Sequence, residues 1–171
     1  MAKPALKPHE HEEGTSARAT DQAHTAASAM ANAEEMCRTT GARLTPIRRK
    51  VLEALYATHK PLGAYDLAEM LGPKGRRLAP ITVYRALDFL IEQGLVHRLA
   101  SQNAYIACAH QHPAGEAVAF LICENCGAVD EVTSPALTKT LGDVLQREKF
   151  TARGQILEIT GQCGQCSGGA R

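Results

Sequence analysis

The chain has 171 residues, enough for one medium domain or two small ones, and 44% of them are hydrophobic, an ordinary fraction for a globular protein. No apolar run is long enough to span a bilayer and the N-terminus lacks the apolar core of a secretory signal, so we expect a cytoplasmic protein. The net charge is only +1, but residues 38–98 carry eleven basic and five acidic side chains, whereas both flanking segments are net negative. The middle third is therefore a candidate polyanion-binding surface, although a solvated basic face would show the same charge.

Residues 1–24 are predicted to form a disordered tail, because their surroundings are acidic and contain Pro, Ala and Ser with few large apolar residues. His9 and His11 in this tail could bind a metal only weakly. Further along, Cys37 falls in a predicted helix, where we expect it to pack rather than to bind a ligand.

The basic middle third predicts three helices followed by a hairpin. The expected helices lie in RLTPIRRKVLEALYATH, AYDLAEML and ITVYRALDFLIEQG. Thr45 is a candidate N-cap with Pro46 in the first turn, and Gly94 is the candidate residue just past the end of the last helix. LVHRL and AYIAC, joined by a turn at 101–103, are typical of two strands. This order is that of a winged helix–turn–helix.

In such a domain the last helix enters the major groove, with its N-terminal residues nearest the bases. Thr82, Tyr84 and Arg85 lie near that end; Arg85 is suited to guanine or phosphate, and Tyr84 to phosphate or a thymine methyl. Nearby basic residues would add sequence-independent phosphate affinity: Arg43, Arg48, Arg49, Lys74, Arg76 and Arg77. The alternative is a winged helix that contacts proteins, and the charge excess favours DNA.

Two Cys-x-x-Cys pairs follow, Cys123/Cys126 and Cys163/Cys166. In a reducing compartment such spacing points to metal or redox chemistry rather than to disulfides. Each pair supplies two thiolates from one tight turn, and two such turns make a closed tetrahedral zinc site. A thioredoxin-like redox role is the alternative, which two separated pairs disfavour.

The segment between the pairs is long enough to hold structure of its own. Ser134 and Pro135 predict a helix start in SPALTKTLGDVLQREKF, and GQILEITG is typical of a short strand. One face of the helix is apolar: Leu137, Leu141, Val144 and Leu145. We therefore expect zinc to staple both ends of a strand–helix–strand unit.

A second group of possible metal donors has no regular spacing. It comprises His97, Cys108, His110, His112, Glu116 and Glu131. Mixed nitrogen, oxygen and single-thiolate ligation is typical of a reversible metal site. Each residue alone also has an ordinary explanation as a surface polar group or, for Cys108, a small buried residue.

ITVYRALDFLIEQGLVHRL, AYIAC and FLICENCGAVDEV, in this order and followed by the second cysteine pair, resemble the ferric uptake regulator superfamily, and most closely its zinc uptake regulator branch. The resemblance covers about residues 30–166. It implies an α+β fold with a winged-helix DNA-binding domain at 25–107, a hinge at 108–116, and a small α/β dimerisation and metal-binding domain at 117–171.

The resemblance also implies roles for individual residues. It assigns a structural zinc to the four paired cysteines and a regulatory zinc to the junction of the domains. His97, Cys108 and Glu131 match three regulatory ligands, and Tyr65 and Arg85 match DNA-contacting positions.

One position departs from that pattern, because relatives in this branch usually place a histidine seven residues before the first paired cysteine, where this chain has Glu116. Either Glu116 ligates through oxygen, which we favour, or His110 or His112 is the fourth donor. The histidine-rich run of iron sensors is absent.

The sequence thus predicts a zinc-dependent repressor of zinc acquisition genes, a homodimer that binds double-stranded operator DNA and two Zn²⁺ per chain, with no membrane or small organic partner. The alternatives are an iron, manganese or peroxide sensor of the same superfamily, or a zinc-buffering protein that binds no DNA. A metallohydrolase is disfavoured because no general base is paired with a substrate pocket, so we do not expect an enzyme.

Overall fold

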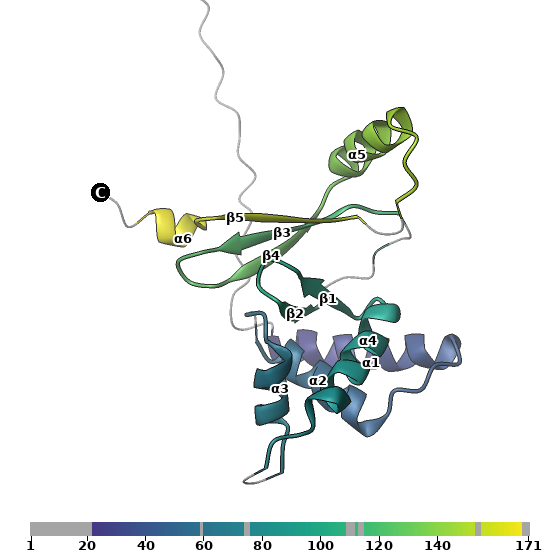
Figure 1. Ribbon diagram of the computed structural model, residues 1–171, viewed down its shortest axis with the longest axis vertical. Helices are drawn as coiled ribbons and strands as arrows, with labels where there is room; N and C mark the ends of the chain where they lie inside the picture. The colour runs from purple at the N-terminus through teal and green to yellow at the C-terminus, as the bar shows by residue number, and fades with distance from the viewer. Residues whose placement is uncertain are drawn as a thin grey trace, which may run out of the picture.

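The computed structural model describes residues 22–58, 60–73, 76–108, 112, 115–152 and 155–168. They form a helical part and a sheet part, with a two-stranded hairpin between them (Figure 1). The predicted disordered tail lies outside the described residues, apart from residues 22–24, which begin the first helix; His9 and His11 lie outside as well. No helix among the described residues is long and apolar enough to cross a membrane.

The helical part contains four helices, and the hairpin follows the last of them on the side that faces the sheet part. They are α1 (Gln22–Thr39), α2 (Pro46–Tyr56), α3 (Ala64–Met70), α4 (Pro80–Glu92), β1 (Val96–Leu99) and β2 (Ala104–Ala107). As predicted, Thr45 precedes α2 with Pro46 at its first position, and Gly94 follows α4 with φ +68°. The hairpin is antiparallel. These elements confirm the predicted winged helix–turn–helix.

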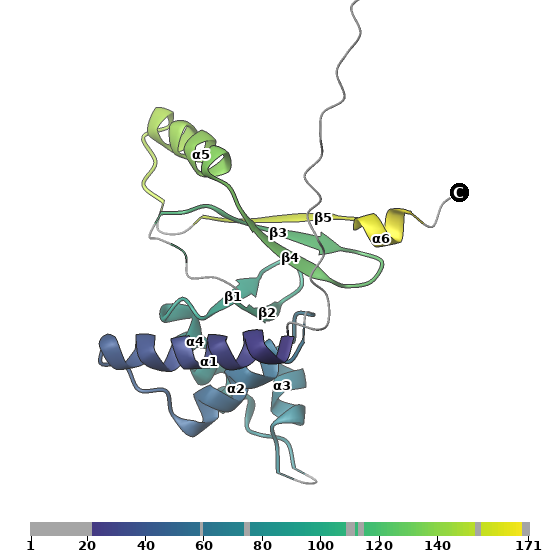
Figure 2. The same ribbon diagram turned by 180° about the vertical axis from the view of Figure 1, so that it is seen from behind.

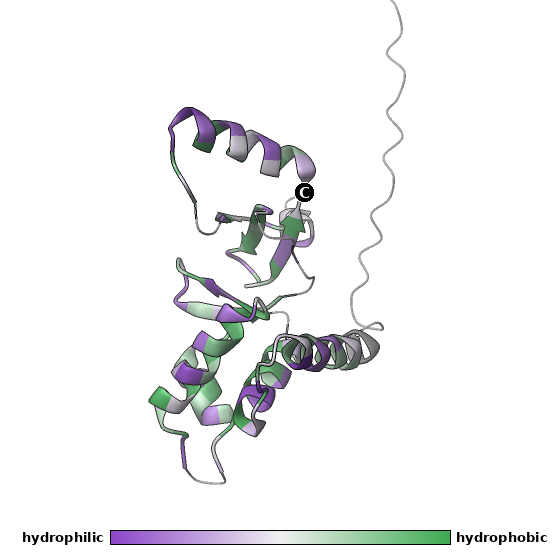
Figure 3. Cartoon of the chain, turned by 90° about the vertical axis from the view of Figure 1, so that its right-hand side faces the viewer, coloured by the Kyte–Doolittle hydropathy of each residue, from purple (hydrophilic) through white to green (hydrophobic). Residues whose placement is uncertain are grey.

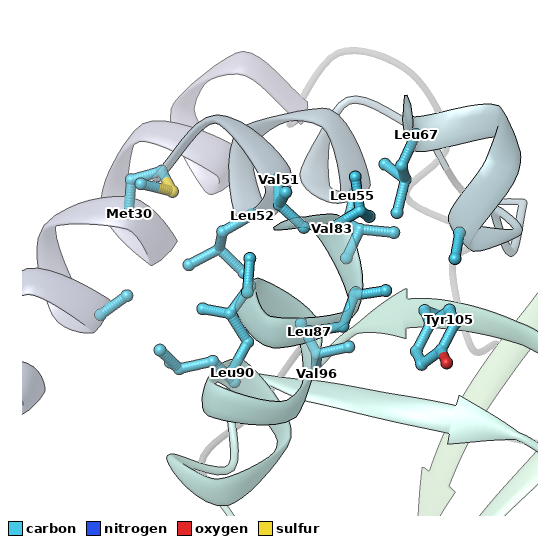
Figure 4. Packing of buried hydrophobic residues seen from close by; sticks show 14 of the residues in the cluster. Met30, Val51, Leu52, Leu55, Leu67, Val83, Leu87, Leu90, Val96 and Tyr105 are labelled. Atoms are coloured by element: carbon cyan, nitrogen blue, oxygen red, sulfur yellow. The ribbon is translucent and has the colours of Figure 1, made fainter. Parts of the chain in front are cut away.

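The helical part has its own hydrophobic core, which positions α4 and the hairpin. This core contains fully buried side chains from three helices and from β1: Leu52 of α2, Leu67 of α3, Leu87 of α4 and Val96 of β1 (Figure 4). α1 runs alongside the bundle (Figure 2) and contributes Cys37, which is buried in this core as expected. Burial also raises the pKa of the Cys37 thiol, so the residue packs as a neutral side chain.

The sheet part follows the predicted strand–helix–strand pattern. Its elements are β3 (Val118–Cys123), β4 (Val129–Thr133), α5 (Pro135–Arg147), β5 (Ile156–Gly161) and α6 (Gly164–Ser167). The strand order is β4-β3-β5, with β3 antiparallel to β4 and parallel to β5. A parallel neighbour needs a crossover connection, and the chain makes it through β4 and α5. The predicted N-terminal signal of α5, Ser134 followed by Pro135, is confirmed.

The hairpin packs on one face of the three-stranded sheet. Leu99 of β1 and Ile106 of β2 form a second buried cluster with Val118, Phe120 and Ile122 of β3. Figure 3 shows the resulting layers: α5, sheet, hairpin and helical bundle. Since no residue of α5 is buried, the outer side of the sheet part is covered far less well than the side that faces the hairpin. The α+β fold class is as predicted.

Candidate metal centres and nucleic-acid interface

The two Cys-x-x-Cys pairs converge at one end of the sheet. Cys123 ends β3 and Cys163 follows β5, and the parallel register that pairs Cys123 with Gly161 brings the two strand ends together. The four Sγ atoms of Cys123, Cys126, Cys163 and Cys166 all lie within 4.8 Å of one another. The structure therefore assembles the cluster that the spacing predicts.

The geometry of this cluster fits a tetrahedral zinc ion. The Sγ atoms of Cys126 and Cys163 are 3.9 Å apart, and Zn–S bonds of 2.3 Å give a tetrahedral S–S edge of about 3.8 Å. Backbone hydrogen bonds from Cys126 and Cys163 lower the pKa of Cys123 to about 6. Hydrogen bonds from the neighbouring thiols instead raise the pKa of Cys166 to about 12. Four crowded sulfurs cannot all ionise alone, and a divalent cation removes that conflict.

A second cluster lies where the hairpin meets the sheet. One donor atom from each of His97, Cys108, His112 and Glu131 lies within 4.8 Å of the other three. Cys108 Sγ is 3.8 Å from Glu131 Oε1, and His112 Nε2 contacts the same carboxylate. His97 stands on β1, Cys108 directly after β2, and Glu131 on β4, so the cluster joins the hairpin to the sheet.

His97 shows that this cluster suits a metal. Its Nε2 atom is buried and has no hydrogen-bond partner among the described residues. Burial lowers the pKa of His97, against the opposing charge of Glu131, so the ring is held in the neutral form that binds metals. The ring also packs against Phe120, with 5.1 Å between centroids, which fixes its direction. A neutral imidazole whose buried Nε2 atom is unused fits a zinc ligand.

Glu116 is not a member of this cluster but contacts one of its residues, His112. Its Oε2 atom is 3.1 Å from Nδ1 of His112, while Nε2 of His112 points to Glu131. A carboxylate on the far nitrogen of a ligating histidine is a recurrent outer partner in metal sites. Of the predicted regulatory residues the structure thus brings together His97, Cys108, Glu131 and the alternative donor His112, and it places Glu116 behind His112. His110 lies outside the described residues.

Tyr56 is a further neighbour of this cluster that sequence reasoning missed. The hydroxyl of Tyr56, at the end of α2, donates a hydrogen bond of 3.2 Å to the carbonyl oxygen of Cys108. Burial raises the pKa of Tyr56 to about 12, so this donor stays protonated. No local pattern marks Tyr56 in the sequence, because its hydroxyl finds a partner only after the fold brings the end of α2 to the residue that follows β2.

Three of the predicted DNA-contacting side chains, Thr82, Tyr84 and Arg85, stand in the N-terminal half of α4, whereas Tyr65 is on α3 and Arg43 precedes α2. Arg85 of α4 and Arg43 before α2 are exposed, and Tyr65 of α3 has 64% of its surface exposed. Thr82 and Tyr84 are half-buried. An exposed arginine and tyrosine close to a helix start are the side chains that a major-groove reader needs.

Some of the predicted basic residues already have acidic partners in the chain. Arg49 forms an ion pair with Glu34 of α1, and Arg77 lies 3.2 Å from Glu69 of α3. These exposed pairs are weak and can exchange for phosphate contacts. Lys74 lies outside the described residues.

Comparison with known proteins gives consistent matches. The Ferric uptake regulator family matches residues 39–160. The Zinc uptake regulation protein of Escherichia coli (strain K12) is 36% identical over 137 residues, 80% of each chain. The Peroxide operon regulator of Bacillus subtilis (strain 168) is 31% identical, over 83% of this chain and 96% of its own. A solved zinc uptake regulator complexed with zinc and DNA superimposes with a TM-score of 0.77 at 35% identity, over 84% of this chain and 96% of its own.

Proposed function

The chain belongs to the ferric uptake regulator family, and we propose that it is a zinc-responsive transcriptional repressor that binds operator DNA and controls genes of zinc uptake and homeostasis. The observation that carries this proposal is the cluster of His97, Cys108, His112 and Glu131, which joins the hairpin of the winged helix to the C-terminal sheet. A metal bound there acts on the position of the DNA-reading domain. The chain is a regulator rather than an enzyme.

We assign two zinc ions to each chain. The first is structural and is held by the four cysteines, whose all-thiolate ligation closes the site to other ligands. A zinc ion there would tie the end of β3 to the segment after β5, and its binding free energy would contribute directly to the folding of the sheet part.

The second zinc ion is regulatory. His97, Cys108, His112 and Glu131 would hold it, with Glu116 orienting His112 from behind. This differs from the ligand set that the sequence favoured, in which Glu116 was the fourth donor, and the reason is the position of the Glu116 carboxylate on the far nitrogen of His112. Two imidazoles and one thiolate favour zinc over the harder metals that carboxylate-rich sites select.

The chain's own residues convert zinc binding into a change in DNA affinity. A bound zinc ion would supply the positive charge that lets the Cys108 sulfur and the Glu131 carboxylate ionise side by side. With both residues held at one site, the hairpin would be fixed on the sheet, and with it α4, which directly precedes β1 and carries Arg85. If zinc binds this closed arrangement better than an open one, a coupling of about 1–3 kcal/mol changes DNA affinity about 5- to 150-fold.

We propose that the active form is a homodimer, because the outer face of the sheet part is apolar and poorly covered. Leu121, Val132 and Ile159 are 39–52% exposed, and β5 is an edge strand. A second copy would cover this face and place two α4 helices on half-sites related by the dimer axis. We expect Arg85, Tyr65, Tyr84, Thr82 and Arg43 to contact the DNA, and the protein to act in the cytoplasm, where bacterial operators lie.

Metal competition tests the function. The affinity of the dimer for a promoter fragment of a zinc uptake gene is measured by fluorescence anisotropy at buffered free Zn²⁺, Fe²⁺ and Mn²⁺. We expect the tightest DNA binding with Zn²⁺ at the lowest free concentration. If Fe²⁺ or Mn²⁺ activates at lower concentrations than Zn²⁺, the chain is a sensor of another metal or of peroxide. Zinc binding without DNA binding would make it a zinc-buffering protein.

A further inference from the structure

The carboxylate of Glu158, on β5, binds the turn between β1 and β2, which we call the wing turn (residues 100–103). Oε1 of Glu158 accepts a hydrogen bond of 2.7 Å from the backbone N–H of Ala100, and Oε2 accepts one of 3.0 Å from the N–H of Ser101. The hydroxyl of Ser101 donates a third hydrogen bond to Oε2. One side chain of the C-terminal sheet thus binds two successive backbone groups of the DNA-binding part.

The register of the sheet explains why the Glu158 contact and the second metal cluster both join the same hairpin to the sheet. Phe120 of β3 pairs with Glu131 of β4 on one side and with Glu158 of β5 on the other. These three side chains therefore stand in one row on the face that carries the hairpin. Glu131 reaches the metal cluster at the open ends of β1 and β2, whereas Glu158 reaches the turn. The hairpin lies beside the three-stranded sheet (Figure 1), and its Leu99 and Ile106 share a buried cluster with Phe120.

We propose that Glu158 is a positioning residue: a clasp that fixes the wing turn to the C-terminal sheet without metal and so prepares the hairpin for the regulatory zinc. The part of this inference that concerns zinc rests on the proposed function. The part that concerns the hairpin and the sheet rests only on the contacts of Glu158.

The chemistry of the contact requires a carboxylate. Only an ionised carboxylate offers acceptors on both oxygens, and hydrogen bonds to a charged acceptor are stronger than neutral ones. Burial raises the pKa of Glu158, but the hydrogen bonds from Ser101 and Ala100 outweigh that effect and lower it below the usual range, so the group is ionised at neutral pH. Since two of the donors are backbone groups, Glu158 is the only side chain whose replacement removes the whole contact.

The turn itself is built to present these donors. Asn103 adopts a left-handed backbone with φ +48°, and its Oδ1 atom accepts a hydrogen bond of 3.2 Å from Arg98 of β1. Asn tolerates this conformation better than most residues. In this turn the N–H groups of Ala100 and Ser101 point to the Glu158 carboxylate on the sheet.

The clasp lowers the cost of forming the metal cluster. If the hairpin is already docked on the sheet, His97 and Cys108 are close to Glu131 before zinc binds. If only a fraction of the molecules has a docked hairpin, the apparent zinc affinity is the intrinsic affinity multiplied by that fraction. Because the contact is partly exposed, its effect is modest, and we expect replacement of Glu158 to weaken regulatory zinc binding about 3- to 10-fold.

Amide hydrogen exchange measured by NMR tests the clasp directly. The samples are the full-length dimer with its structural zinc, with and without the second zinc ion, as wild type, Glu158→Ala and Glu158→Gln. The isosteric Gln variant guards against a general loss of folding. Glu148→Gln is the matched control, since Glu148 is an exposed glutamate of the same part of the chain. Ser101→Ala removes only the hydroxyl donor.

We expect exchange at the Ala100 and Ser101 amides to become about 3- to 10-fold faster in both Glu158 variants, in both zinc states, with a smaller change in Ser101→Ala and none in Glu148→Gln. Unchanged exchange at these two amides in Glu158→Ala would overturn the clasp, even if zinc-dependent DNA binding is normal. Faster exchange in a chain that never binds DNA would keep the clasp and remove the proposed repressor function.

Discussion

The identity of the fourth ligand of the regulatory site can be decided by comparing His112→Ala with Glu116→Gln. In the structure His112 Nε2 faces the cluster and Glu116 binds the far nitrogen at 3.1 Å. Loss of an outer carboxylate of this kind costs about 10- to 100-fold in metal affinity, or about 1.4–2.7 kcal/mol. Loss of a direct ligand must cost more, because it also leaves a coordination position to water. We therefore expect His112→Ala to weaken the second zinc ion more than Glu116→Gln does.

The double variant sharpens this prediction. If Glu116 acts only through His112, then Glu116→Gln has little further effect once His112 is alanine, and the two losses are not additive. The assay is competition with a chromophoric chelator on the dimer whose four-cysteine site is already filled, so that only the second zinc ion exchanges. A larger loss in Glu116→Gln than in His112→Ala, or additive losses, would refute the geometry and restore Glu116 as the direct donor.

Three further substitutions test the four-cysteine site, the core of the helical part and the DNA interface separately. Cys123→Ser removes a structural ligand, and we expect the sheet part to unfold or the dimer to dissociate; an undiminished melting temperature and dimer mass would contradict this. Leu87→Ala opens a cavity at a side chain with no exposed surface and should lower the free energy of unfolding by about 2–5 kcal/mol in denaturant titrations, with bound zinc unchanged; a loss below 1 kcal/mol would be inconsistent with the packed core. Arg85→Ala should weaken operator binding without changing the metal content, and unchanged affinity would remove it from the DNA interface.

Local signals made most of the fold predictable. Thr45–Pro46 and Ser134–Pro135 mark helix starts through rules that involve only neighbouring residues, and the structure has α2 and α5 begin there. The two Cys-x-x-Cys pairs are equally local, because each pair is one tight turn, and their meeting follows from the parallel pairing of β3 with β5.

The regulatory cluster was harder to predict because its donors come from separate elements. His97, Cys108 and Glu131 could be named from the sequence as possible donors, but their irregular spacing left their role as ligands to the resemblance to a family. The choice between Glu116 and His112 depends on the path of the loop before β3. The clasp of Glu158 has no sequence signal at all, since its partners are backbone groups 57 and 58 residues away. Contacts of this kind depend on how the hairpin docks on the sheet, and no periodicity or spacing encodes them.

The central claim is that zinc at the second cluster, and not at the four cysteines, controls DNA binding. Its most direct test is operator affinity measured across buffered free zinc, with bound zinc counted on the same samples. We predict weak DNA binding at one zinc ion per chain and a gain of about 5- to 150-fold as occupancy rises from one to two. Tight binding that is already complete at one zinc ion per chain, or no gain on filling the second site, would contradict the account.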